Sequence, residues 1–133
     1  MAGNIKHSPD DRLSRFIRSK RHVAETKRLV KLNAFMPPSN KILSVFHTQR
    51  INEFQIWQLA DEHLPTDKPI RIRADISVRN VSKANLSIDW NYRPKYHVDI
   101  IGWPDGKDDQ KARALELAKH SELIIRSNKH LSK

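Results

Sequence analysis

The segment YHVDIIGW at residues 96–103 places a histidine and an aspartate where they could act together. His97 and Asp99 are two positions apart, and in an extended strand such residues point to the same face of the sheet. A carboxylate that orients an imidazole is the basic unit of general acid–base catalysis, and a nearby arginine could hold an anionic substrate. The pattern indicates a small enzyme that cleaves phosphodiester or glycosidic bonds, of the nuclease or nucleotide-processing type. The alternative is a half-exposed strand histidine with one hydrogen bond, and the absence of a nucleophile motif favours it.

The charge of the chain indicates a second kind of chemistry, the binding of phosphate. The 133 residues include 25 Lys and Arg against 15 Asp and Glu, a net charge of +10. Residues 1–33 hold nine of the basic residues and three of the acidic ones, so this basic N-terminal segment carries more than half of the excess. Such asymmetry is typical of proteins that attract phosphate-rich partners, although a solubilising surface has the same composition.

The segment IRIRADISVR at residues 70–79 could place several of the positive charges on one face of a strand. Its apolar and polar residues alternate over ten positions, which predicts a strand with one buried face and one solvent face. Arg71, Arg73 and Arg79 fall on the polar face, where same-face neighbours are about 7 Å apart, close to the phosphate repeat of a nucleic-acid strand. The predicted polyanion-binding residues are these three and a cluster nearer the N-terminus: Arg15, Arg18, Lys20 and Arg21. The alternative is an ordinary solvated face, partly balanced by Asp75 and Asp89.

Five strands and two helices are expected around these residues. The strands are predicted at residues 14–19, 42–48, 70–79, 84–92 and 96–103, with residues 80–85 forming a hairpin between the third and the fourth. The alternative for the first strand is a helix that begins at residues 8–11, since Leu13, Phe16 and Ile17 also have helical spacing. Asn52 is expected to cap a helix over residues 53–64, and Asp105 or Asp108 a last helix. That helix has a narrow stripe of small or apolar residues: Ala114, Leu117, Ala118 and Ser121.

These elements predict one domain over residues 1–133. Its expected fold class is α+β, a mostly antiparallel sheet with about two helices packed on one side. Residues 127–133 are expected to form a frayed tail. The three tryptophans lie at apolar positions of the pattern and are interpreted as core. A third hypothesis is an interaction protein that pairs through a strand edge or through the helix bearing Phe54 and Trp57.

Several other classes of protein are not supported by the composition. There is no cysteine, so disulfides and cysteine-based zinc sites are excluded and a cytoplasmic protein is expected. The histidines show no metal-ligand spacing, and with only three glycines there is no glycine-rich phosphate loop. We therefore expect no metal and no cofactor. No apolar run of 18 or more residues occurs, so we expect no membrane partner.

The chain resembles a family of small uncharacterised bacterial proteins. The motifs that carry the resemblance are AFMPP, LSVFHT, FQIW and HVDIIGWP followed by ALELA, within residues 14–123. The resemblance implies a stable fold and no particular activity. The family's pattern has arginine at the position of His47, which argues against an essential role for that histidine.

Overall fold

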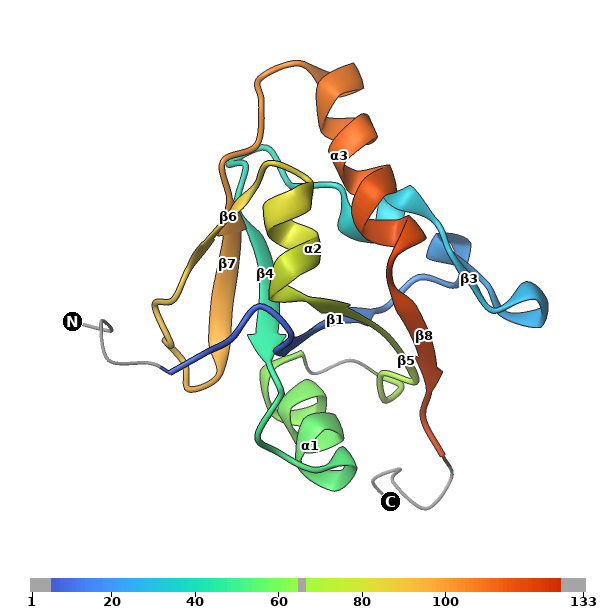
Figure 1. Cartoon of the computed structure of the whole chain (residues 1–133). Coiled ribbons are helices and arrows are strands. Elements are labelled where there is room, and N and C mark those ends of the chain that lie inside the picture. The colour runs from blue at the N-terminus through green and yellow to red at the C-terminus, as the bar shows by residue number, and fades with distance from the viewer. Residues whose placement is uncertain (1–5, 65–66, 128–133) are drawn as a thin grey trace.

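The computed structural model describes residues 6–64 and 67–127 and has a six-stranded antiparallel sheet as its centre. The order of the strands is β6-β7-β4-β1-β5-β8, and a separate two-stranded sheet pairs β2 with β3 (Figure 1). The strands are β1 (Arg12–Ile17), β2 (Val23–Ala24), β3 (Leu29–Val30), β4 (Leu43–His47), β5 (Ile72–Ser77), β6 (Ser87–Asp89), β7 (His97–Ile101) and β8 (Glu122–Ile125). The helices are α1 (Glu53–His63), α2 (Val78–Lys83) and α3 (Lys107–Lys119), and the 3-10 turns are η1 (Lys20–His22), η2 (Glu25–Lys27) and η3 (Leu32–Phe35). The predicted α+β class with a mostly antiparallel sheet is confirmed.

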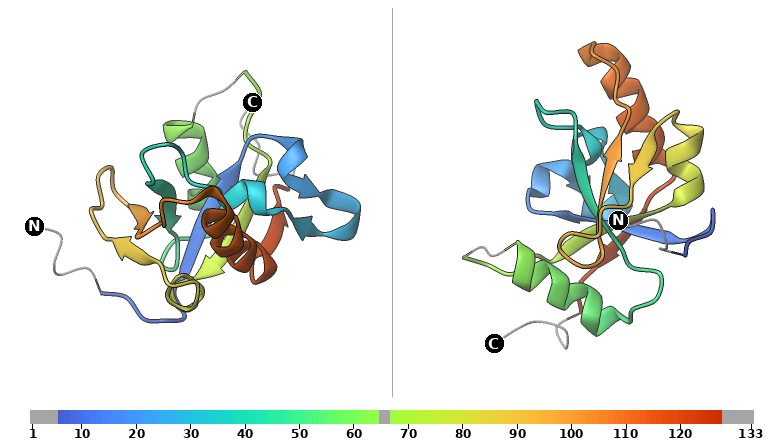
Figure 2. Two further views of the ribbon diagram at one scale, coloured as in Figure 1. Left: turned by 90° about the horizontal axis from the view of Figure 1, so that it is seen from above. Right: turned by 90° about the vertical axis from the view of Figure 1, so that its left-hand side faces the viewer.

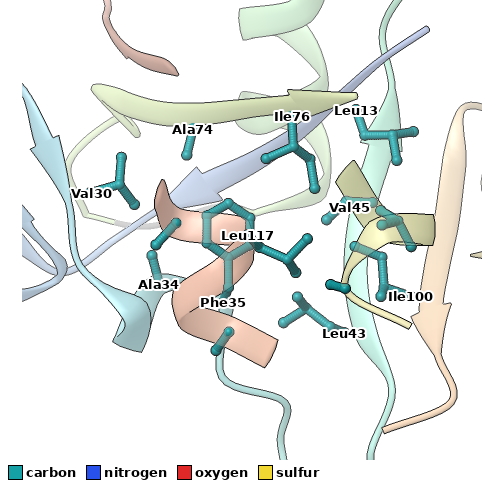
Figure 3. Packing of buried hydrophobic residues seen from close by; sticks show 14 of the residues in the cluster. Leu13, Val30, Ala34, Phe35, Leu43, Val45, Ala74, Ile76, Ile100 and Leu117 are labelled. Atoms are coloured by element: carbon teal, nitrogen blue, oxygen red, sulfur yellow. The ribbon is translucent and has the colours of Figure 1, made fainter. Parts of the chain in front are cut away.

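Helices cover both faces of the large sheet. Helices α2 and α3 lie on one side and α1 lies on the other side (Figures 1 and 2). The two helices predicted from the sequence, α1 and α3, are therefore on opposite faces, and α2, which was not predicted, is the second helix beside α3. The larger hydrophobic cluster fills the α2/α3 side and includes Leu13, Phe35 and Leu117 (Figure 3). A smaller cluster around Phe46 and Trp57 lies under α1. Because both faces are covered, polar residues on alternate strand positions are also drawn into the interior.

Helix α1 begins where its capping signal predicts. The Asn52 side chain accepts a hydrogen bond from the Gln55 backbone N–H, and the Gln55 side chain accepts one from the Asn52 N–H. This reciprocal capping box satisfies two of the donors that a helix N-terminus leaves open. The helix packs on the sheet through its buried residues Ile56, Trp57, Leu59 and Ala60, whereas Phe54, an apolar residue of the same helix, is exposed.

The predicted hairpin at residues 80–85 is wrong. Strand β5 ends at Ser77, whose side chain caps α2 in a second capping box with Asn80. The chain then leads to β6, which pairs with β7 at the edge of the sheet instead of with β5. The Ser77–Asn80 spacing is itself a helix-start signal, and it overrides the apolar alternation that continues to Val78.

Helix α3 also departs from the prediction at its start. Its N-cap is Gly106, without a side-chain cap, while Asp108 and Asp109 occupy the first turn, where acidic groups complement the helix dipole. Neither Asp105 nor Asp108 is the cap. The stripe of Ala114, Leu117 and Ala118 is buried as predicted. The predicted tail lies outside the described residues beyond position 127.

Candidate functional site

The arginine predicted to lie at the centre of the basic strand face is buried. The Arg73 side chain is 1% exposed, and its guanidinium donates hydrogen bonds to both carboxylate oxygens of Asp75 and of Glu53. Asp75 is also buried and accepts a hydrogen bond from the Ser14 hydroxyl at 2.6 Å. The prediction that Arg73 faces solvent is therefore wrong. Helix α1 covers this face, and Glu53 at its first turn supplies a carboxylate for the buried cation.

Two buried arginines lie over the ring of Trp57 in α1. The Cζ atoms of Arg73 and Arg126 are 5.0 Å and 5.4 Å from the centre of the indole ring. Arg126, just after β8, donates to both oxygens of Asp61 at 2.9 and 2.8 Å. Glu53, Trp57 and Asp61 are spaced by four residues and share one face of α1. That face therefore holds two cations of the sheet as well as apolar side chains.

The other two arginines of the alternating segment lie at its two ends, in different elements. Arg79 lies in α2, where its guanidinium pairs with Asp10 at 2.9 Å. Arg71 precedes β5 and is exposed. The predicted row of three arginines on one solvent face is therefore not formed, because a helix begins at Val78 and α1 covers Arg73.

Arg71 instead lies beside the N-terminal basic cluster. The register of β1 with β5 pairs Ile17 with Ile72, so the next residues along each strand, Arg18 and Arg71, are neighbours at this end of the antiparallel pair. Both line a surface pocket of about 830 Å³. The other polar residues that line this pocket are Lys20, Lys68, Glu25 and Asp67. Four basic residues and two acidic ones thus surround one cavity, and we call it the Arg71 pocket.

A second pocket of about 390 Å³ lies where β1 and β4 separate. The two strands pair only at Leu13–His47 and Ser14–Phe46. Beyond these pairs, the Arg15 guanidinium donates to the Ser44 carbonyl at 2.9 Å, and also to the Ala34 carbonyl at 3.1 Å. The residues that line this Arg15 pocket include Arg15, Arg18, Ser19, His22 and Ser44. Arg18 lines both pockets, so the two form one basic region.

Positive charges in the Arg15 pocket repel one another. Burial and the nearby charge of Arg18 lower the pKa of Arg15. Burial and the charge of Arg15 likewise lower the pKa of His22. No described carboxylate forms an ion pair with Arg15 or Arg18. An anion bound here would supply the counter-charge that both groups lack.

The structure brings together four of the seven predicted polyanion-binding residues. Arg15, Arg18, Lys20 and Arg71 line the two pockets. Arg21 is exposed in η1 but lines neither of them. Two residues that the sequence interpretation missed, Lys68 and His22, line them as well. The nearness of His22 to the basic cluster RSKR in the sequence could have indicated it, whereas Lys68 depends on the fold.

His97 and Asp99 lie on one face of β7, as two-residue spacing predicts. His97 Nε2 is 3.4 Å from Asp99 Oδ1, and the two side chains are 17% and 14% exposed. Asn91 connects them, since it donates to Asp99 at 2.6 Å and its carbonyl oxygen is 3.1 Å from His97 Nδ1. Neither the Arg71 pocket nor the Arg15 pocket is lined by His97 or Asp99. The aspartate and Asn91 thus orient the imidazole of His97, but neither of the two pockets lies beside it.

A second histidine is held between an acid and a phenol. His47 Nε2 is 2.8 Å from Asp11 Oδ2, and His47 Nδ1 is 2.9 Å from the Tyr92 hydroxyl. Both His47 and Asp11 are buried. Burial by itself raises the pKa of Asp11, but hydrogen bonds from His47 and Ser8 outweigh it and hold this pKa below its ordinary value. The arrangement ties three distant segments together and was not predicted from the sequence.

Comparisons with known proteins do not test the family resemblance, which stays a prediction. Searches of protein-family models, of curated proteins and of solved structures found no match. In the described part of the chain no helix has the length and apolar character needed to cross a membrane. Within residues 6–64 and 67–127 no three His, Asp or Glu side chains are grouped as metal ligands.

Proposed function

We propose that this protein binds nucleic acid or another phosphate-rich partner through the basic region formed by the Arg71 and Arg15 pockets. The observation that supports this most directly is the Arg15 guanidinium. It is partly buried in the gap between β1 and β4 and lies next to Arg18, and its hydrogen-bond partners among the described residues are carbonyl oxygens. A cation held in this way gains more from an incoming anion than an ion-paired one such as Arg73.

The arrangement of the two pockets fits an extended polyanion better than a single small anion. Arg18 lines both pockets, while Arg15 lines one of them and Arg71 the other. A chain of phosphates that crosses Arg18 would meet a cation in each pocket. Binding of this kind releases counterions, so it weakens steeply with added salt.

The proposal is tested by measuring binding of a fluorescently labelled oligonucleotide and of inorganic polyphosphate at several salt concentrations. The Arg18→Ala and Arg71→Ala variants should each bind more weakly, and each should reduce the slope of log affinity against log salt by about one. Lys83→Ala and Lys111→Ala are matched controls, because these exposed lysines lie on α2 and α3 and line neither pocket. Equal losses in all four variants, or binding that does not respond to salt, would contradict the proposal.

The second candidate function is an enzyme of the nuclease or nucleotide-processing type, with His97 as acid or base, Asp99 as the residue that orients it and an arginine as the anion holder. The contact of 3.4 Å between these two side chains favours it. Arg15 is a candidate for the anion holder, since it donates to the Ser44 carbonyl, and Ser44 pairs with Asp99 across β4 and β7. Hydrolysis of a phosphodiester should then be lost in His97→Ala but not in His120→Ala, and activity retained in both would exclude this candidate.

A further inference from the structure

One aromatic ring of the N-terminal segment lies flat on a tryptophan. The imidazole of His7 stacks on the indole of Trp90, with ring centres 4.0 Å apart and an angle of 13° between the planes. His7 is exposed and forms no hydrogen bond or ion pair with the other described residues. Among the described residues, the stacking on Trp90 is therefore the side-chain interaction that holds the ring. Another flat ring, such as that of a ligand, could therefore displace the His7 imidazole and stack on Trp90 in its place.

The surroundings of Trp90 combine aromatic rings with positive charge. Trp90 begins the loop of residues 90–96 that joins β6 to β7. Tyr92 and Tyr96 of this loop are half-buried, with ring centres 5.8 Å apart, and the Lys95 ammonium lies 5.2 Å from the centre of the Tyr96 ring. Arg93 and Lys95 are exposed and form no ion pair with the described carboxylates. We call this surface the 90–96 platform.

The backbone of the platform is held in an unusual conformation. Tyr92 and Tyr96 have φ angles of +52° and +73°, which residues other than glycine adopt rarely. The Tyr92 hydroxyl is fixed by His47, which is fixed in turn by Asp11. Strained residues that are fixed by their surroundings concentrate at binding sites, where they keep side chains in place before the ligand arrives. Trp90 itself packs on the larger hydrophobic cluster, and His47 meets it edge-on at 5.0 Å.

We propose that the 90–96 platform binds an unpaired nucleobase, which displaces His7 and stacks on Trp90. This rests on the proposed phosphate-binding function and makes the partner single-stranded nucleic acid. Arg93 and Lys95 would then meet the phosphates that flank the stacked base. Single strands are favoured because their bases have free faces, whereas the bases of a duplex are already stacked on one another.

The test uses the fluorescence of Trp90 and the affinity for three probes: oligo(dT), a duplex of the same number of phosphates, and inorganic polyphosphate. The other two tryptophans, Trp57 and Trp103, are buried, so quenching by a stacked base reports on Trp90. Trp90→Leu should lower the affinity for oligo(dT) about tenfold, the usual effect of removing one stacking partner. It should leave the affinity for polyphosphate unchanged.

The His7→Ala variant is the sharper measurement, because His7 is exposed and its removal leaves the core intact. Removal of the ring that competes for Trp90 should raise the affinity for oligo(dT) about two- to fivefold, while a surface that acts by charge alone would show no gain. A gain with oligo(dT) but not with polyphosphate supports the stacking site. No gain, or equal effects on all three probes, overturns it.

The same measurements separate the two proposals. If polyphosphate binding depends on Arg18 and Arg71 but Trp90 and His7 have no effect on oligo(dT), the stacking site is refuted and the basic region is supported. If oligo(dT) quenches Trp90 but Arg18→Ala and Arg71→Ala leave the affinity unchanged, the basic region is refuted. The stacking site is then supported, with Arg93 and Lys95 as the residues that meet the phosphates.

Discussion

Removal of the Arg73 side chain tests whether a cation is buried under α1. In Arg73→Ala, five hydrogen bonds to two carboxylates are lost. Glu53 is 46% exposed and can be solvated again, so its share of the loss is small. Asp75 is only 8% exposed and keeps the hydroxyl of Ser14 as its partner. The cost of the variant is therefore concentrated on a buried carboxylate that has lost its counter-charge.

Loss of one partner of a buried ion pair costs about 3–5 kcal/mol of unfolding free energy. Because Asp75 retains one strong hydrogen bond, we expect the lower part of that range, about 3 kcal/mol, for Arg73→Ala. The matched variant Arg71→Ala removes an exposed arginine two residues before Arg73. It should change the free energy of unfolding by less than about 0.5 kcal/mol. Urea denaturation followed by circular dichroism measures both values.

A double-mutant cycle separates the ion pair from other losses. In Arg73→Ala combined with Asp75→Ala, neither charge is left alone in the interior. The double variant should therefore be more stable than the sum of the single losses predicts, by about 2 kcal/mol. If Arg73→Ala costs no more than Arg71→Ala, or if the two single losses add, Arg73 is solvated and the interior arrangement described above is wrong.

Three further predictions concern the elements around the site. Asn52→Ala should lower the unfolding free energy by about 1 kcal/mol through loss of the α1 cap, whereas Gln58→Ala, on the exposed side of the same helix, should be nearly neutral in the same denaturation assay. Tyr92→Phe should lower the free energy of unfolding by about 1 kcal/mol, because His47 loses a hydrogen-bond partner. An unchanged free energy of unfolding would mean that the Tyr92 hydroxyl is solvated instead. The pKa of Asp11 is lower in the folded protein than its ordinary value of 3.8, so its contribution to stability is present above that value and is lost as the pH falls below it. The pH dependence of unfolding between about pH 5 and 2 should accordingly be shallower in Asp11→Asn than in the unaltered protein.

Elements whose signals are local were predicted from the sequence. The Asn52 cap and the apolar stripe after it predict α1, and alternating apolar residues predict β5 and β7. Each of these signals involves residues within about ten positions of one another. A local pattern of this kind is sufficient to specify the type of an element.

The surroundings of each element depend on partners far away in the sequence. Alternation in β5 identifies two faces, but it cannot show that a helix covers the polar one. The partners of Arg73 and Arg126 are Glu53 and Asp61 on α1, and only the fold places them there. The spacing of these two acids on either side of Trp57 was a sequence signal for a face that binds cations.

The basic region could be predicted in part for the same reason. Arg15, Arg18 and Lys20 are close in the sequence, and their clustering indicated phosphate binding. The place of Arg71 beside Arg18 follows from the antiparallel register of β1 and β5, which joins segments more than 50 residues apart. No composition or periodicity in either segment specifies that pairing.

The central place of β1 has a consequence for synthesis on the ribosome. This strand emerges first, yet both of its edges are occupied by strands made much later, β4 on one side and β5 on the other. Until residues 72–77 leave the exit tunnel, Leu13, Phe16 and Ile17 have no complete surface to pack against. Pairing over such sequence separations is slow, so we expect β1 to stay without its β5 partner while residues up to 77 are being synthesised.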